Sequence, residues 1–321
     1  MTLVNPSKFW LGGNIFGYSA QEDAAIEILD NAAKQGVNGI DTSSSYSEGV
    51  SETIIGRWLN HDKAKRQRFH VSTKVGLNSY ENPIGLGKPR RIMETLNSSL
   101  QRLQTDYVDV LFLHAPDPET DISVTVEAFH ELQQNGLIKG FGICNASPAE
   151  VQKYLSIIDS IGISQEHFYI QNYFNWARRK HDYWNDFSNA GHWNSINSVS
   201  YGLLARGAFM PESGIHDRFS RKNMNSKIMA EITNPNLKSK FQFIESLCRD
   251  KGQTLYSYAL AYGYYLSNYS IIGVRTLNQL GELIEVSDNL MPQNDFDEIR
   301  KGIEALKLEF SDGLGDPLII F

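Results

Sequence analysis

Four residues with acid–base side chains stand at or just after the ends of three short apolar runs. Asp41 and Lys74 end two of these runs, His114 ends a third, and Tyr46 follows Asp41 by five residues. A phenol, with an ordinary pKa of about 10, is a poor acid or base at neutral pH, and an adjacent ammonium favours the phenolate form and lowers that pKa. A carboxylate would keep the lysine charged, and the imidazole could hydrogen-bond a substrate oxygen. The set suits reversible protonation of a carbonyl oxygen, and because it supplies no hydride, a cofactor is required.

The segments that must position these residues alternate between short apolar runs and amphipathic stretches. The apolar runs are too short for helices and are bounded by turn-forming residues, so they are predicted strands at 9–11, 39–41, 70–74, 108–114, 138–143, 168–171, 198–201 and 270–273. Helices are expected between and after them. The first has apolar positions Ala25, Ile28, Leu29 and Ala32 on one face, and others lie near 51–59, 89–103, 124–134, 237–251, 254–266, 277–286 and 296–308. Serine and glutamate three residues apart predict capping boxes at Ser19–Glu22 and Ser147–Glu150.

Eight such alternations predict a parallel sheet that closes into a (β/α)8 TIM barrel, with long rim loops and a C-terminal helix. We expect a single barrel domain over residues 1–321. The longest irregular stretches are about 172–197 and 207–236. Because the carboxyl ends of the strands share one rim in such a barrel, Asp41, Lys74 and His114 are expected to meet there.

Composition excludes several classes of protein. The 321 residues carry a net charge of −7 and show no basic stripe, which argues against nucleic-acid binding. No apolar run approaches the roughly 18 residues of a membrane span, and the N-terminal residues lack the features of a signal peptide. The two distant cysteines, Cys144 and Cys248, suggest a reducing, cytoplasmic location. Metal-binding spacings, phosphate loops and the Gly-x-Gly-x-x-Gly dinucleotide pattern are all missing, so no metal is expected.

The segment from Gly39 to Glu52, Gly-Ile-Asp-Thr-Ser-Ser-Ser-Tyr-Ser-Glu-Gly-Val-Ser-Glu, closely resembles the signature of the aldo-keto reductase family around its catalytic Asp and Tyr. The runs that end at Lys74 and His114 resemble the family's lysine and histidine strands. The resemblance implies a barrel that binds NADP(H) without a Rossmann motif, with NAD(H) less favoured. It also implies that Asp41, Tyr46, Lys74 and His114 form the catalytic tetrad, with Tyr46 as general acid in reduction and general base in oxidation.

The same resemblance implies a set of cofactor-binding residues. Asn145 and Gln171 match the family's ligands of the nicotinamide carboxamide, and Cys144 stands where the family commonly has serine. A thiol is a weaker donor and acceptor than a hydroxyl, so Asn145 and Gln171 are expected to carry most of that contact. Further positions match the nicotinamide-stacking tyrosine, the pyrophosphate loop and the adenosine-phosphate site: Tyr201, Gly202, Leu204, Arg206, Gly273, Arg275, Gln279 and Glu282.

The expected function is therefore reversible, NADP(H)-dependent reduction of aldehydes, ketones or sugar lactols to alcohols, with a small-molecule carbonyl or alcohol as the partner. Two alternatives stay open. Some family members resemble channel-associated subunits that bind cofactor with little turnover, and a different barrel enzyme could use the tetrad for isomerisation. Aromatic residues of the predicted rim could line the substrate pocket, namely Phe16, Tyr18, Tyr80, Trp176 and Trp184. The sequence leaves the oligomeric state open.

Overall fold

Eight strands make up the sheet of the computed structural model, which describes residues 6–62, 64–76, 84–176, 196–204 and 235–305. The strands are β1 (Phe9–Gly12), β2 (Gly39–Asp41), β3 (His70–Val75), β4 (Val108–Leu113), β5 (Ile138–Cys144), β6 (Phe168–Tyr173), β7 (Asn197–Tyr201) and β8 (Tyr269–Ile272). They follow one another around a closed barrel in chain order, and β1 pairs in parallel with both β2 and β8. The predicted (β/α)8 barrel is confirmed.

Both faces of a parallel barrel sheet are buried, and strands such as β4 (Val-Asp-Val-Leu-Phe-Leu) are accordingly mostly apolar. Every residue of β3 and β4 is buried. The register places Asp41 beside Ser72 and Lys74 beside Phe112, so the polar strand ends lie at neighbouring positions of the sheet. This register is what brings separate parts of the sequence to one site.

Contacts group the chain into two compact units. The first comprises Met1–Asn172, Tyr183–Val199 and Asn268–Glu282, and the second comprises Tyr173–Asp182, Ser200–Ser267 and Leu283–Phe321. The expectation of a single domain over residues 1–321 stays a prediction.

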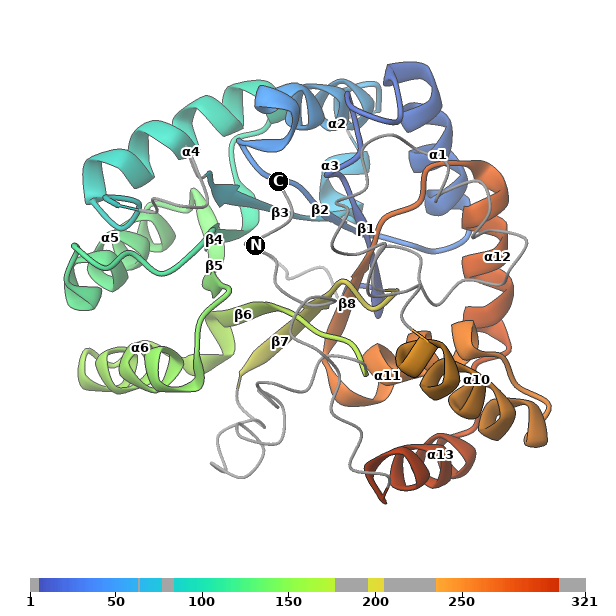
Figure 1. The fold of residues 1–321 in the computed structure, drawn as a ribbon. Helices are drawn as coiled ribbons and strands as arrows, with labels where there is room; N and C mark the ends of the chain where they lie inside the picture. Colours follow the sequence, from blue (N-terminus) through green and yellow to red (C-terminus); the bar gives the residue numbers. More distant parts are fainter. Residues whose placement is uncertain (1–5, 63, 77–83, 177–195, 205–234, 306–321) are drawn as a thin grey trace. The chain divides into compact units, whose positions relative to one another are not determined.

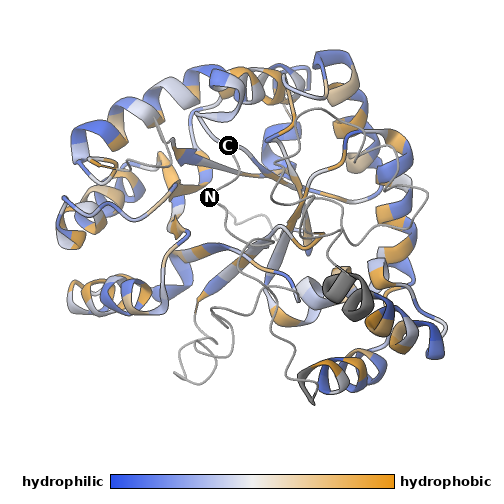
Figure 2. Ribbon diagram, viewed as in Figure 1, coloured by the Kyte–Doolittle hydropathy of each residue, from blue (hydrophilic) through white to orange (hydrophobic). Residues whose placement is uncertain are grey.

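The helices of the first unit lie outside its strands (Figure 1). They are α1 (Glu22–Lys34), α2 (Val50–Asn60), α3 (Lys65–Arg68), α4 (Pro89–Leu103), α5 (Ile122–Gln134) and α6 (Pro148–Ser160), with short 3-10 turns η1 (Tyr46–Gly49) and η2 (Gln165–His167). Figure 2 shows hydrophobic and hydrophilic residues alternating along these helices. In α1 the buried residues are Ala25, Ile28, Leu29 and Ala32, the stripe expected at helical spacing.

The two predicted capping boxes have different outcomes. Ser147 Oγ accepts a hydrogen bond from the Glu150 backbone, and the Glu150 side chain accepts one from the Ser147 backbone, so this capping box is confirmed. The box predicted at Ser19 is wrong, because the chain makes a tight turn there, with Ser19 N donating to Ile15 O. Helix α1 consequently begins later, after Gln21, whose side chain makes no capping hydrogen bond.

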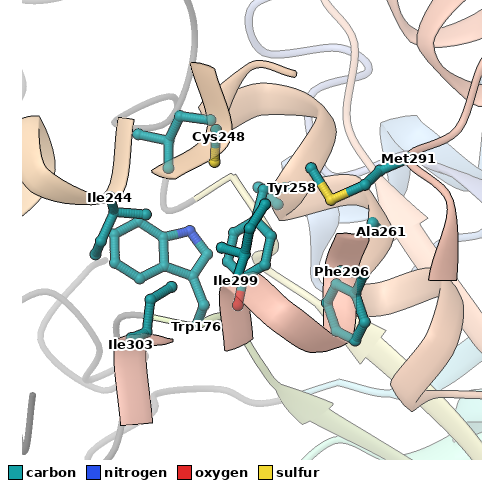
Figure 3. Packing of buried hydrophobic residues seen from close by; sticks show 11 residues of the cluster. Trp176, Ile244, Cys248, Tyr258, Ala261, Met291, Phe296, Ile299 and Ile303 are labelled. Atoms are coloured by element: carbon teal, nitrogen blue, oxygen red, sulfur yellow. The ribbon is translucent and has the colours of Figure 1, made fainter. Parts of the chain in front are cut away.

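The remaining helices are α10 (Pro235–Asp250), α11 (Leu255–Leu266), α12 (Leu277–Asp288) and α13 (Gln293–Ala305). A hydrophobic cluster in the second unit joins α10, α11 and α13 to Trp176, as Figure 3 shows. Trp176 is fully buried among Ile244, Tyr258 and Ile303 in this cluster, and Phe16 of the first unit is fully buried as well. Neither can line a substrate pocket as the sequence suggested, whereas Tyr18 is 70% exposed. Tyr80 and Trp184 lie outside the described residues.

Candidate active site

The structure brings the four predicted acid–base residues together at the carboxyl ends of β2, β3 and β4. Lys74 Nζ donates hydrogen bonds to Asp41 Oδ2 over 2.6 Å and to Thr42 O over 2.8 Å. The same ammonium lies 4.8 Å from the centroid of the Tyr46 ring. The Tyr46 ring meets the His114 ring edge to face, with centroids 5.8 Å apart. The four side chains therefore form one contiguous cluster.

Asp41 is held by three donors from two strands, β3 and β6. Besides Lys74, Ser72 Oγ donates to Asp41 Oδ1 over 2.8 Å, and Gln171 Nε2 donates to the same oxygen over 2.9 Å. Ser72 reaches this carboxylate because it stands two residues before Lys74 on β3, and alternate residues of a strand face the same side. The side chains of Asp41 and Lys74 are 4% and 1% exposed, so the ion pair is shielded from water.

Tyr46 begins the turn η1, whose backbone is unusual. Ser47 and Glu48 have φ values of 48° and 56°, in the left-handed region, and Gly49 follows at 88°. Residues other than glycine enter this region at a cost of about 1–3 kcal/mol, so surrounding contacts must hold the turn. Ser47 Oγ donates to Phe16 O over 2.9 Å and supplies one such contact. The turn fixes the direction in which Tyr46 leaves the backbone.

His114 directly follows β4 and is 3% exposed. Its Nδ1 lies 3.2 Å from Ser43 Oγ, and its backbone oxygen accepts a hydrogen bond from Asn145 Nδ2 over 3.0 Å. Ser43 and Ser72 were missed by the sequence reasoning. Their spacing could have indicated that they belong to the site, because Ser43 stands two residues after Asp41 and Ser72 two residues before Lys74.

Burial dominates the proton affinities in this cluster. It raises the pKa of Tyr46 well above its ordinary value, and the negative charge of Asp41 adds to the effect. Burial also lowers the pKa of His114 well below its ordinary value, with a further contribution from the charge of Lys74. Burial and Asp41 thus raise the Tyr46 pKa, against the lowering expected from Lys74 alone. At neutral pH Tyr46 is a phenol and His114 a neutral imidazole.

The three residues predicted to contact the nicotinamide carboxamide lie next to this cluster. Cys144 Sγ donates to Gln171 Oε1 over 3.6 Å, and Gln171 in turn donates to Asp41. Asn145 has a positive φ of 58°, and its backbone N–H donates to Gln171 O over 3.0 Å. Gln171 therefore links the Cys144 thiol to the Asp41 carboxylate, a connection that the sequence did not indicate.

The predicted phosphate-site residues of the first unit surround the start of α12. Arg275 is exposed, and its backbone N–H donates to Gln279 Oε1 over 2.8 Å. Thr276 Oγ1 accepts from Gln279 N, which caps the helix, and Glu282 is exposed one turn further along. At Gly273 an added Cβ would meet only Asn14 Oδ1, at 3.5 Å, so the chain is open there. An exposed cation at a helix N-terminus fits a phosphate group.

The residues predicted for the stacking and pyrophosphate contacts belong to the second unit. The Tyr201 ring meets Tyr173 edge to face at 5.5 Å. Gly202 has a φ of 78°, and an added Cβ would overlap the Tyr173 ring, so glycine is required there. Leu204 packs against the hydrophobic cluster of Figure 3. Arg206 lies outside the described residues.

The described residues contain neither a metal-binding cluster nor a membrane-spanning helix. No group of three or more His, Cys, Asp or Glu side chains is arranged to hold a metal ion in the described part of the chain. Within the same residues, no helix has the length and apolar character needed to cross a membrane.

The site thus lies at the strand ends of an eight-stranded parallel barrel, where Asp, Tyr, Lys and His side chains cluster. The family model described as the aldo/keto reductase family matches residues 8–304, and the chain belongs to this family. Norsolorinic acid reductase B of Aspergillus parasiticus is 30% identical over 279 residues, which cover 84% of this chain and 71% of that protein.

Other relatives match over shorter segments. Aldo-keto reductase YhdN of Bacillus subtilis is 34% identical over 148 residues, 46% of this chain and 44% of that protein. A putative voltage-gated potassium channel subunit beta of Schizosaccharomyces pombe is 35% identical over 154 residues, again 46% of this chain and 44% of that protein. The chain thus matches less than half the length of these two relatives. A glycerol dehydrogenase structure from Gluconobacter oxydans shares the fold, with a TM-score of 0.72 at 22% identity, covering 97% of this chain and 94% of that one.

Proposed function

We propose that this protein is an NADP(H)-dependent oxidoreductase that reversibly reduces the carbonyl group of aldehydes, ketones or sugar lactols. The observation that carries the proposal is the position of Lys74, whose ammonium is bound by Asp41 at 2.6 Å and lies 4.8 Å from the Tyr46 ring. A buried ion pair costs desolvation and adds little to stability. Its place beside a phenol and an imidazole is better explained by proton transfer.

In the reducing direction Tyr46 would donate its proton to the carbonyl oxygen. The raised pKa of Tyr46 keeps the phenol protonated over the neutral range, so the acid form is ready. As the proton leaves, the nearby Lys74 ammonium would stabilise the developing phenolate charge. Asp41 would keep Lys74 charged and directed, and neutral His114 would hydrogen-bond the carbonyl oxygen and orient it.

The residues present fit a nicotinamide cofactor. When bound, this group supplies the hydride in reduction and accepts it in oxidation. Asn145 and Gln171 would hold its carboxamide, while Tyr201, Gly202, Leu204 and Arg206 are proposed for stacking and pyrophosphate contacts. Gly273, Arg275, Gln279 and Glu282 are proposed for the adenosine end. The exposed guanidinium of Arg275 at the start of α12 supports NADPH over NADH, because a 2′-phosphate adds charge that a helix N-terminus and a cation attract.

The cytoplasm is the proposed location, because both cysteines are buried free thiols. The channel-associated alternative is favoured by the similarity to the putative voltage-gated potassium channel subunit beta of Schizosaccharomyces pombe. It predicts tight NADPH binding with little carbonyl turnover and recovery of a membrane protein as partner.

The deciding experiment follows the loss of NADPH absorbance with an activated aldehyde and with glyceraldehyde. We expect Tyr46→Phe to lower kcat by about 10²–10⁴-fold, the usual contribution of a general acid, while NADPH binding measured by fluorescence persists. Tyr264→Phe, in the second unit, is the matched control and should leave kcat unchanged. Equal rates for wild type and Tyr46→Phe across several substrates would refute the tyrosine assignment. NADPH binding without turnover would favour the channel-associated alternative.

A further inference from the structure

Behind the Asp41–Lys74 pair, on the helix side of the sheet, lies a buried carboxylate that the proposed chemistry does not use. Glu52 stands in the first turn of α2 and is fully buried. Its Oε1 accepts a hydrogen bond from Thr73 Oγ1 over 2.5 Å, and its Oε2 accepts one from Arg102 Nε over 2.7 Å. A carboxylate buried to this extent is costly unless its partners stay in place, so it constrains the groups that satisfy it.

The first of these partners belongs to the strand that carries Lys74. Thr73 precedes Lys74 on β3, and successive side chains of a strand point to opposite faces. Lys74 therefore reaches Asp41 while Thr73 reaches Glu52, so that the two faces of one strand are bound at adjacent residues. A shift of β3 along its axis would disturb both contacts together.

The second partner, Arg102, packs against the turn η1, which begins at Tyr46. Arg102 is at the end of α4, and a Cβ added at Gly49 would lie only 2.8 Å from Arg102 Cδ and Nε. Gly49 ends the turn η1 that Tyr46 begins, so the guanidinium held by Glu52 packs directly against that turn. The Glu52 carboxylate thereby connects the backbone that orients Tyr46 with the strand that orients Lys74.

The neighbouring residue of α2 makes a parallel connection to β2. Thr42 Oγ1 lies 2.8 Å from Ser51 Oγ, and Ser51 Oγ donates to Gly13 O over 2.8 Å. Thr42 follows Asp41 and also accepts the second Lys74 hydrogen bond through its backbone oxygen. The first turn of α2 therefore holds both β2 and β3 at the residues next to the Asp41–Lys74 pair.

We propose that Glu52 is a positioning residue: through Thr73 and Arg102 it sets the position of the Lys74 ammonium relative to the Tyr46 phenol. Glu52 touches neither member of that pair and acts only through the two groups that it binds. The inference rests on the proposed function, in which Lys74 and Tyr46 carry out the proton transfer. Loss of the Glu52 contacts should therefore impair the chemical step and leave cofactor binding intact.

The test compares Thr73→Val, which removes one hydroxyl at nearly constant volume, with Thr73→Ser, which keeps it. Thr125→Val is the matched control, because Thr125 is also a buried threonine, and its hydroxyl donates outside the candidate site, to Gly87 O over 3.1 Å and to Asp121 O over 3.4 Å. We expect Thr73→Val to lower kcat about tenfold or more, since small displacements of catalytic groups are costly, with the KM for NADPH unchanged. Thr73→Ser should recover most of the rate, and Thr125→Val should lower the melting temperature similarly with kcat unchanged.

A crystal structure of Thr73→Val supplies a readout that does not depend on activity. The Lys74 Nζ to Asp41 Oδ2 distance, 2.6 Å in the native chain, should lengthen, or the Tyr46 ring should move. Glu52→Gln is a second variant for the same measurements. A folded Thr73→Val protein with the kcat of Thr125→Val, or with Lys74 and Tyr46 unmoved, overturns the positioning role. If the wild type shows no carbonyl turnover, the proposed function fails, and the crystal structure alone decides whether Glu52 positions the pair.

Discussion

Lys74 Nζ and Asp41 Oδ2 are 2.6 Å apart, and both side chains are almost completely buried. Their contact joins β2 to β3 on the inner side of the sheet, and Lys74 Nζ also binds the backbone oxygen of Thr42. Burial makes each charge depend on the other. The pair is therefore sensitive to the loss of either partner.

Replacing Asp41 with asparagine should destabilise the fold as well as impair catalysis. The substitution leaves the Lys74 ammonium buried without a counter-charge, a change that typically lowers the free energy of unfolding by about 3–5 kcal/mol. Urea unfolding followed by circular dichroism measures the change. Arg90→Ala is the control, since its pair with Glu94 is 2.8 Å long but exposed to solvent, and we expect no measurable effect. An Asp41→Asn protein as stable as wild type would show that the buried Lys74 ammonium does not depend on the charge of Asp41.

His70, at the start of β3, should make stability fall as the solution becomes acidic. The residue is 2% exposed and packs on Trp10 with ring centroids 4.7 Å apart, and among the described residues neither of its ring nitrogens has a hydrogen-bond partner. Burial lowers the pKa of His70 to about 4; Asp109 opposes the shift, and the charges of Arg66 and Lys139 add to it.

In the unfolded chain His70 binds a proton near its ordinary pKa, so the free energy of unfolding begins to fall as the pH drops below about 6.5. The fall is complete near the pKa of His70 in the folded chain and amounts to about 3 kcal/mol. The lowered pKa of His114 acts in the same direction. Urea midpoints between neutral pH and pH about 4.5 should therefore decline less steeply for His70→Phe than for wild type. The exposed His61→Phe variant is the control, and a His70→Phe slope equal to that of the control would contradict the prediction.

The capping contact at α6 should contribute measurably to stability, whereas the start of α1 should not. Ser147→Ala removes a side chain that accepts from the Glu150 backbone and should cost about 1 kcal/mol. Gln21→Ala changes the equivalent position of α1, where no side chain caps the helix, and should cost no more than a few tenths of that amount. Thermal unfolding of the two variants in parallel compares them. Equal losses would mean that the Ser147 contact contributes nothing specific.

The arrangement of elements and the identity of the candidate tetrad could both be predicted from the sequence. Strands such as β4 are short apolar runs because a parallel barrel buries both of its faces, and helices such as α1 and α4 have a buried stripe at helical spacing. A polar side chain at the end of a buried strand is costly unless it has a partner or a function, which singled out Asp41, Lys74 and His114. Tyr46 was included because it follows Asp41 by five residues. A barrel places those ends on one rim, so position along the chain was sufficient to predict that they meet.

Only the tertiary structure decided what surrounds these residues. The link from Cys144 through Gln171 to Asp41, and the link from Glu52 through Thr73 and Arg102, join residues far apart in sequence, and no periodicity indicates them. Burial also depends on the whole fold. It removed Phe16 and Trp176 from the expected pocket and raised the pKa of Tyr46, against the lowering expected from Lys74 alone. Sequence spacing determines which groups share a strand face, whereas desolvation and long-range hydrogen bonds depend on the atoms that the folded chain packs around them.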